Sequence, residues 1–209
     1  MPRNGKFETA VTLFLSEQAP ELAKAHDELY PERVSERIPL SLTLLYPFAP
    51  RDELDEDHLQ MLRDFFSSRQ ALAFDIARVS QWEGGGAVYG VPEPDQQLRG
   101  TMRALWELFP AFPPYGGADD PPPHASLTLD GGSDSAATLA RVEKRLEGLL
   151  PAHFEVGEAV LMAEHEPDVW RPIHTFPFQQ YRASRSCFSS TRAVEAPRGL
   201  MYGNAPRAG

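Results

Sequence analysis

Apolar and polar residues alternate along several short segments of the chain, which is the period of a β-strand. Segments with this alternation, or with runs of β-branched and aromatic residues, predict strands at 8–15, 41–48, 71–79, 87–91, 124–130, 154–162 and 170–178. Apolar residues spaced three or four apart predict helices at 21–30, 52–68, 95–109 and 135–150. The connections are too short for many parallel crossovers, so we expect an α+β fold with mostly antiparallel strands and helices packed outside them.

Periodicity is lost after residue 178, where Ser, Arg, Ala, Gly and Pro dominate. This change predicts one domain over 1–178 and a flexible C-terminal tail over 179–209. The start of the chain lacks the apolar core of a signal peptide, and no run of about 18 apolar residues follows. We therefore expect a soluble, cytoplasmic protein that does not enter a membrane.

The charge balance narrows the choice of partners. The chain has 30 acidic and 20 basic residues and a formal net charge of -10. Binding of long nucleic acid needs clustered Lys and Arg to neutralise phosphates, so this composition argues against it while a small phosphorylated ligand stays possible. The single cysteine, Cys187, excludes an internal disulfide and a multi-cysteine metal site, which suits a reducing cytosol.

Two segments repeat one pattern. Ser41-Leu42-Thr43-Leu44 and His124-Ala125-Ser126-Leu127 each follow a loop that contains proline. Residues two apart in a strand face the same side, so each segment presents two polar groups from one face and two apolar groups from the other. If the two strands sit together, all four polar side chains converge on one cleft.

These segments resemble the paired HxT and HxS motifs of the two-histidine phosphoesterases, the superfamily that includes the so-called 2′-5′ RNA ligases and RNA cyclic phosphodiesterases. IPLSLTLLYPF at 38–48 is similar to the first motif and PPPHASLTLD at 121–130 to the second. The order of elements fits from about residue 8 to 178. The resemblance implies a bilobal domain with two mostly antiparallel sheets, pseudo-twofold symmetry and outer helices.

The resemblance also implies a mechanism. In that superfamily two histidines act as general acid and general base on a phosphodiester, hydroxyl groups hold the phosphate oxygens, and neither a metal nor another cofactor is needed. Carried over by position, His124 is one acid/base, Thr43 and Ser126 hold phosphate, and Ser41 stands at the other acid/base position. A serine hydroxyl does not exchange a proton near pH 7, so Ser41 departs from the family's chemistry.

Three explanations for Ser41 stay open. Another histidine can enter the cleft, and His174 is the first candidate and His165 the second. The reaction can need only one acid/base, as when the leaving group departs without protonation. The site can also serve binding alone, or a substrate without phosphate.

Four further groups of residues are candidates for the cleft. Arg171 can contact a phosphate, and Tyr46 and Tyr115 can bind substrate, as can Trp82 and Tyr89 by stacking on a flat ligand. The loop 110–120 leads to His124 and is either a lid or a rigid connector.

The sequence leaves three functions open. The first is a divergent, metal-independent phosphodiesterase, a hydrolase that acts on a small nucleotide, a short RNA end or a cyclic phosphate. The second is a repurposed enzyme in which His124 moves a proton in an isomerisation, cyclisation or elimination of a phosphate-free molecule. The third is a binding protein without turnover. The oligomeric state is open in all three.

Overall fold

The structure is a computed structural model, and it describes residues 7–82, 87–117, 120–129 and 135–179 of the 209 residues. The tail predicted at 179–209, with Cys187, lies outside these residues beyond Gln179. None of the described helices is both long enough and apolar enough to cross a membrane.

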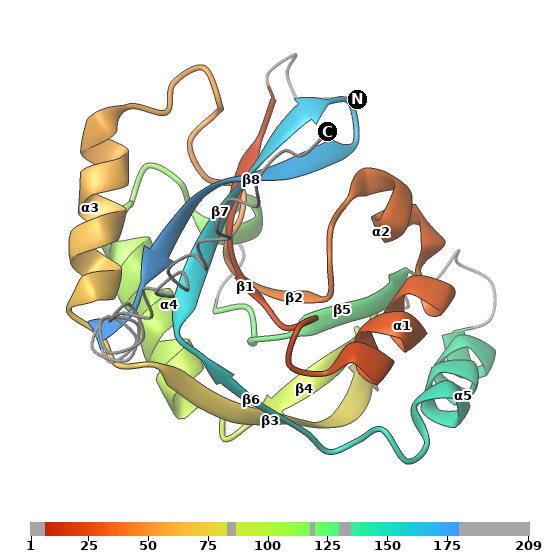
Figure 1. The fold of residues 1–209 in the computed structure, drawn as a ribbon. Helices are drawn as coiled ribbons and strands as arrows, with labels where there is room; N and C mark the ends of the chain where they lie inside the picture. Colours follow the sequence, from red (N-terminus) through yellow and green to blue (C-terminus); the bar gives the residue numbers. More distant parts are fainter. Residues whose placement is uncertain (1–6, 83–86, 118–119, 130–134, 180–209) are drawn as a thin grey trace, which may run out of the picture.

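The described strands form one curled sheet, and neighbouring strands in it are antiparallel (Figure 1). Its order is β6-β3-β4-β5-β2-β1-β7-β8. The predicted α+β fold with antiparallel strands is confirmed, and the two expected sheets are the two halves of this one. The halves meet where β2 pairs with β5 at Leu42 and Ala125. The strands are β1 (Thr9–Phe14), β2 (Ser41–Leu45), β3 (Leu72–Gln81), β4 (Ala87–Glu93), β5 (Ala125–Leu129), β6 (Ala152–Val156), β7 (Glu158–Glu166) and β8 (Val169–Pro177).

Helices α3 and α4 pack against the outside of the sheet, as their amphipathic sequences predict. Phe66 of α3 is fully buried and its ring stacks on Phe176 of β8, 6.0 Å between centroids. Trp106 of α4 donates from Nε1 to the Leu44 carbonyl oxygen of β2 at 2.9 Å. The helices are α1 (Pro20–Leu29), α2 (Pro31–Glu36), α3 (Glu56–Ser67), α4 (Gln96–Leu108) and α5 (Ser135–Leu146), with a short 3-10 turn, η2 (Pro114–Gly116).

Helix α3 begins four residues later than the sequence predicts. The Asp55 side chain accepts a hydrogen bond from the backbone N–H of His58 at 2.9 Å, so Asp55 is the N-cap and the preceding acidic residues form a turn. A side-chain acceptor at this position satisfies a helical N–H that has no partner within the helix. Only Glu56 and Asp57 of the acidic residues lie in the first turn of the helix, where they suit the positive end of its dipole.

The strand predicted at 154–162 is two strands that belong to opposite halves of the sheet. β6 pairs with β3 at one edge, whereas β7 pairs with β1 and β8 in the other half. The break falls at Gly157, between Val156 and Glu158. The burial pattern changes at this point: β6 alternates between buried and exposed residues, whereas six consecutive residues of β7 are buried.

Helix α2 was not predicted. It spans six residues, begins with Pro31 and is followed by Arg37 in the left-handed conformation, at φ 61°. None of its residues is buried, so it lacks the apolar stripe on which a helix prediction depends. It nevertheless contributes to the site, because two of its side chains face the cavity described next.

Candidate active site

Strands β2 and β5 bring the two repeated segments together at the centre of the sheet. Leu42 pairs with Ala125, and the strands are antiparallel. One step along this register places Thr43 opposite His124, and one step the other way places Ser41 opposite Ser126. Residues directly opposite each other have Cβ atoms about 4.5–5.5 Å apart. We call these four residues the motif quartet.

The quartet lines a cavity of about 360 Å³. The apolar residues that alternate with it, among them Leu42 and Ala125, are buried on the opposite face of the sheet. Tyr46 and Tyr115 also line the cavity. The other lining residues come from three regions. The first is β1 with the residue before it, β7, the turn after β7 and the start of β8: Glu8, Ala10, Thr12, Met162, Glu164, Asp168 and Trp170. The second is α1 and its end, with His26 and Tyr30, and the third is α2 and the segment after it, with Arg33, Glu36, Ile38 and Pro39.

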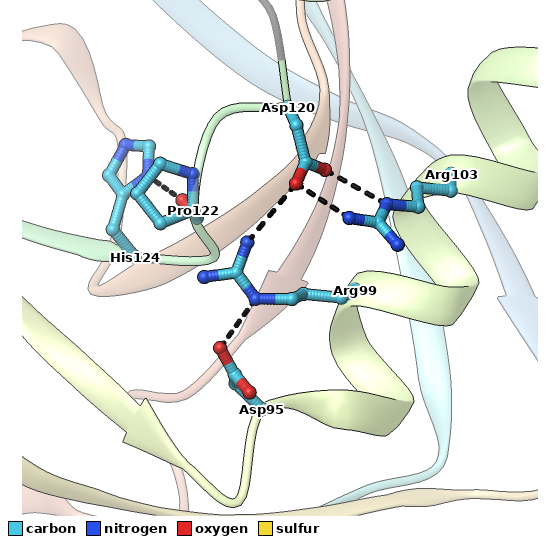
Figure 2. Close-up of polar contacts among 6 residues, drawn as sticks. All are labelled: Asp95, Arg99, Arg103, Asp120, Pro122 and His124. Carbon is cyan, nitrogen blue, oxygen red and sulfur yellow. Dashed lines mark hydrogen bonds and ion pairs between the residues drawn. The ribbon is translucent and has the colours of Figure 1, made fainter.

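His124 is held in one orientation and one tautomer. Its Nδ1 lies 2.8 Å from the carbonyl oxygen of Pro122 (Figure 2). A carbonyl oxygen only accepts, so Nδ1 carries the hydrogen and Nε2 keeps a free lone pair in the neutral ring. Nε2 lies 3.5 Å from the Tyr115 hydroxyl. Burial raises the pKa of that hydroxyl to about 12, so it stays protonated and can donate to Nε2.

Aromatic rings surround His124. The ring centroids of Trp82, Tyr89 and Tyr115 lie 5.1, 5.6 and 5.9 Å from its own, and 8% of the residue is exposed. Burial lowers the pKa of His124 below 6.5, and the positive charge of Arg33 lowers this pKa further. The hydrogen bond to Pro122 acts in the opposite direction. His124 is therefore neutral at pH 7. Trp82 and Tyr89 pack against the ring and are not part of the cavity lining.

The loop before His124 is tied down at two points. The Tyr115 N–H donates to the Tyr46 carbonyl oxygen at 2.6 Å. Asp120 accepts from Arg103 through both carboxylate oxygens, at 2.9 and 2.6 Å, and lies 3.6 Å from Arg99, which itself pairs with Asp95 at 2.6 Å (Figure 2). A two-point arginine contact adds geometric definition even where exposure makes its energy small. The sequence left two interpretations of the loop 110–120, a lid or a rigid connector, and these contacts favour the rigid connector.

Charge is divided unevenly around the cavity. Arg33 is the single Lys or Arg among the described residues that line it, and its guanidinium carbon lies 5.0 Å from the centre of the Tyr30 ring. The carboxylates of the lining are Glu8, Glu36, Glu164 and Asp168. Glu8 accepts a hydrogen bond from the Tyr46 hydroxyl, and buried Glu164 accepts from the Asp168 N–H at 2.8 Å. Of the described Lys and Arg side chains, Arg33 alone is therefore placed to compensate the charge of an anionic group in the cavity.

His174, the first candidate for a second cavity histidine, does not reach the cavity. Strict alternation along β8 would put it on the face of Trp170, which lines the cavity. However, the register slips: Met162 pairs with Pro172 and Leu161 pairs with His174. Because one residue is skipped, His174 takes the face of Leu161, away from the cavity, and is exposed. The sequence-based expectation for His174 is wrong because of this bulge.

Arg171 and His165 also lie outside the lining. Arg171 is exposed and pairs with Ala163, which is buried on the face opposite the cavity. Neighbouring residues of a strand face opposite sides, so Arg171 points away from the face of Trp170, and the prediction that it contacts a phosphate fails for that reason. His165 is partly exposed near the end of β7 and is not among the residues around the cavity.

Sequence reasoning missed two basic residues of the cavity. Arg33 lies on α2, whose sequence has no apolar stripe and therefore did not indicate a helix. His26 lies on α1 and is 2% exposed. His26 is four residues after Leu22 and three before Leu29, so it lies on the buried face of the predicted helix. The spacing of the apolar residues therefore indicated that His26 is buried.

Removing the charge of Arg33 is expected to raise the pKa of His124. In Arg33→Gln the pKa should move towards 6.5 without reaching it, because burial, the larger cause of the shift, stays. NMR titration of the His124 ring measures this directly. The matched control is Arg171→Gln, which should raise the pKa of His165, on which Arg171 acts, and leave His124 unchanged. An unchanged His124 pKa in Arg33→Gln would show that Arg33 does not act on this ring.

Comparisons with known proteins agree with this geometry. Residues 14–168 match the family model of the 2'-5' RNA ligase superfamily. No curated protein sequence matches the chain significantly. LigT from E. coli, solved with 3'-AMP, is 14% identical with a TM-score of 0.57, and the match covers 84% of this chain and 99% of LigT. TT0787 from Thermus thermophilus is 18% identical with a TM-score of 0.52, and the match covers 82% of this chain and 98% of TT0787.

At these identities the likeness to solved structures shows the fold alone, whereas the family model matches the sequence from β1 to the turn before β8. Both repeated segments and most of the residues that line the cavity fall within that span. The chain therefore belongs to the 2'-5' RNA ligase superfamily, within the two-histidine phosphoesterases that the segments at Ser41 and His124 resemble.

Proposed function

We propose that this chain is a metal-independent phosphodiesterase that hydrolyses a small nucleotide substrate, either a 2′,3′-cyclic phosphate or the phosphodiester of a short RNA end. The observation that carries the proposal is the position of His124. Its Nε2 is unprotonated, it belongs to the cavity lining, and hydroxyl-bearing residues of the motif quartet lie beside it.

In the proposed reaction His124 takes a proton from the attacking water as its oxygen bonds to phosphorus. A base with a pKa near or below the working pH suits this step. The hydroxyls of Thr43, Ser126 and Ser41 donate hydrogen bonds to the phosphate oxygens, and Arg33 compensates their charge. As the phosphorus–ribose oxygen bond breaks, the leaving oxygen must gain a proton. Ser41 stands where the family motif has a histidine, and it does not supply that proton.

The size of the cavity favours a small substrate. Its volume of about 360 Å³ lies in the range of small-molecule sites, about 300–1,000 Å³. LigT, with which the chain shares its fold, has been solved with 3'-AMP, with NADP+ and with ATP. These ligands support a small nucleotide as the substrate. The net charge of -10 argues against long RNA.

The acidic lining supports a second candidate from a different class. Four carboxylates and one arginine surround the cavity, and this balance suits a substrate with no phosphate or with a cationic end better than one that carries several phosphates. In that case His124 would transfer a proton in an isomerisation, cyclisation or elimination. A protein that only binds such a ligand is the non-catalytic form of the same candidate.

The test is hydrolysis of 2′,3′-cyclic AMP and of a short 2′-5′-linked oligonucleotide in the presence of a metal chelator, with the products identified as monophosphates. Turnover is expected for the chain as it stands. The control is His174→Ala, which changes an exposed histidine outside the cavity and should keep the full rate. If neither substrate turns over and inorganic phosphate does not bind, the phosphodiesterase proposal fails and the phosphate-free candidate takes its place.

A further inference from the structure

His26 lines the same cavity as the motif quartet but belongs to neither repeated segment. It is 2% exposed and lies on α1, one turn before Tyr30, another cavity residue. Neither the family motifs nor the proposed reaction gives it a role. A buried histidine that reaches the cavity is the kind of group that the missing proton donor requires.

The contact between α1 and β5 places His26 at a definite end of the quartet. Thr128 lies two residues further from His124 than Ser126 does. It is buried, and a slip in register against β4, where Ser126 pairs with Tyr89 and Thr128 pairs with Val88, turns it to the core face of the sheet. Its hydroxyl donates to the Leu29 carbonyl oxygen at the end of α1, at 2.8 Å. Helix α1 therefore stands against the far end of β5, away from His124.

His26 consequently approaches the quartet from the side of Ser126 and Ser41, because these two residues face each other across β5 and β2. His124 and Thr43 form the other end. A phosphate held by the hydroxyls between the two ends would have an imidazole on each side. Acid–base catalysis of a displacement at phosphorus needs two groups arranged in this way, one near the attacking oxygen and one near the leaving oxygen.

The neighbours of His26 suit a proton donor. Its Nδ1 lies 3.1 Å from a carboxylate oxygen of Asp27, which accepts the Nδ1 hydrogen and leaves Nε2 to exchange a proton. Burial lowers the pKa of His26, while Asp27 opposes this by its hydrogen bond and its charge, and Arg33 lowers it further. A bound phosphate anion would act in the same direction as Asp27 and favour the protonated ring.

We propose that His26 is the second proton-transfer residue of this active site and supplies the acid that Ser41 cannot. This inference rests on the proposed phosphodiesterase function. As water attacks phosphorus, its proton passes to His124. As the bond from phosphorus to the ribose oxygen breaks, that oxygen takes the Nε2 proton of protonated His26. The cycle ends with His124 protonated and His26 neutral, and exchange with solvent restores both.

A double-mutant cycle tests this assignment. It compares kcat/KM for 2′,3′-cyclic AMP in the natural chain, His26→Asn, Ser41→His, and the double variant. His26→Asn is expected to lower kcat/KM by about 10²-fold or more in the natural chain, since one acid–base partner typically contributes about 10²–10⁴-fold. In the Ser41→His background the same change should cost less than about threefold, because the new histidine takes over the proton transfer.

A purely structural His26, packed against the Tyr30 ring at 6.0 Å, would give a different pattern. Its loss would reduce activity equally in both backgrounds and lower the melting temperature in both. An equal loss, or no loss in the natural chain, overturns the proposal. Thermal unfolding of all four proteins is measured alongside, and His26→Gln replaces His26→Asn if the asparagine variant does not fold.

Two controls separate this inference from the proposed function. His58→Asn changes a partly buried histidine of α3 outside the cavity lining and should leave both backgrounds unchanged. If His124→Ala abolishes turnover while His26→Asn has no effect, the phosphodiesterase stands and the role of His26 is wrong. If the natural chain shows no turnover and Ser41→His shows none, the proposed function fails, and the role of His26 fails with it.

Discussion

Replacing His124 by alanine is expected to lower kcat for 2′,3′-cyclic AMP by about 10²–10⁴-fold, the usual contribution of one positioned acid–base group. The expectation follows from the arrangement around the ring. Pro122 fixes the hydrogen on Nδ1, so the neutral ring presents Nε2 as a base, and burial lowers the pKa so that this form dominates at pH 7. The neighbouring Tyr115 hydroxyl cannot replace Nε2 as a base, because it stays protonated to about pH 12.

The measurement is steady-state kinetics across about pH 5–9 for the natural chain and His124→Ala. In the natural chain the acid limb of kcat/KM should lie below pH 6.5, because the base is His124 with a lowered pKa. In the variant this limb should disappear together with the rate. His174→Ala is the matched control and should keep both the rate and the limb. A His124→Ala variant within tenfold of the natural chain, with an unchanged melting temperature, would remove His124 from the mechanism.

The sequence predicted the cavity face of β2 and β5 because the features that define it are local. Alternation in 41–48 and 124–130 indicates two strands whose polar residues share a face. The structure pairs these strands and turns all four polar side chains into one cavity. Leu42 and Ala125, on the opposite face, are buried in the core as the same alternation requires.

Features that depend on distant pairing were not predictable in the same way. His174 follows Trp170 and Pro172 at a strict spacing of two, and only the register slip against β7 turns it to the other face. Gly157 separates two strands that join opposite halves of the sheet, and this division also depends on distant pairing. Alternation with a period of two shows which residues of one strand share a face. It does not show which strand is the partner, or where a bulge turns a side chain to the other face.

The basic residues that complete the cavity come from the N-terminal helices, which carry no motif. Arg33 sits on a six-residue helix without a buried face, and His26 sits among the buried residues of α1. The positions of Arg33 and His26 in the cavity depend on how α1 and α2 lie against the sheet. The hydrogen bond from the Thr128 hydroxyl to the Leu29 carbonyl oxygen fixes part of the position of α1. The sequence therefore predicted the residues of the two repeated segments in the cavity better than the basic residues that complete its lining.

The second large effect is expected from Thr43→Val, which should lower kcat/KM by about 10²–10³-fold, the usual loss for one positioned donor to a developing negative charge. Valine has nearly the shape of threonine and suits a strand equally well, so the change removes the hydroxyl and little else. Thr43 lies opposite His124 on the cavity face of β2. Its hydroxyl is thus placed beside the base, where the phosphate oxygens gain charge as water attacks.

The measurement is kcat and KM for 2′,3′-cyclic AMP, together with the dissociation constant of inorganic phosphate. The loss should fall mainly on kcat and only modestly on phosphate affinity, because the hydrogen bond strengthens as charge develops in the transition state. Thr43→Ser keeps the hydroxyl and should recover most of the rate. Thr175→Val, on β8 and exposed, changes a threonine outside the cavity lining and should have no effect. If Thr43→Val matches the natural chain in both kcat and phosphate affinity, no phosphate lies against Thr43, and a phosphate-free substrate becomes the better explanation of the cavity.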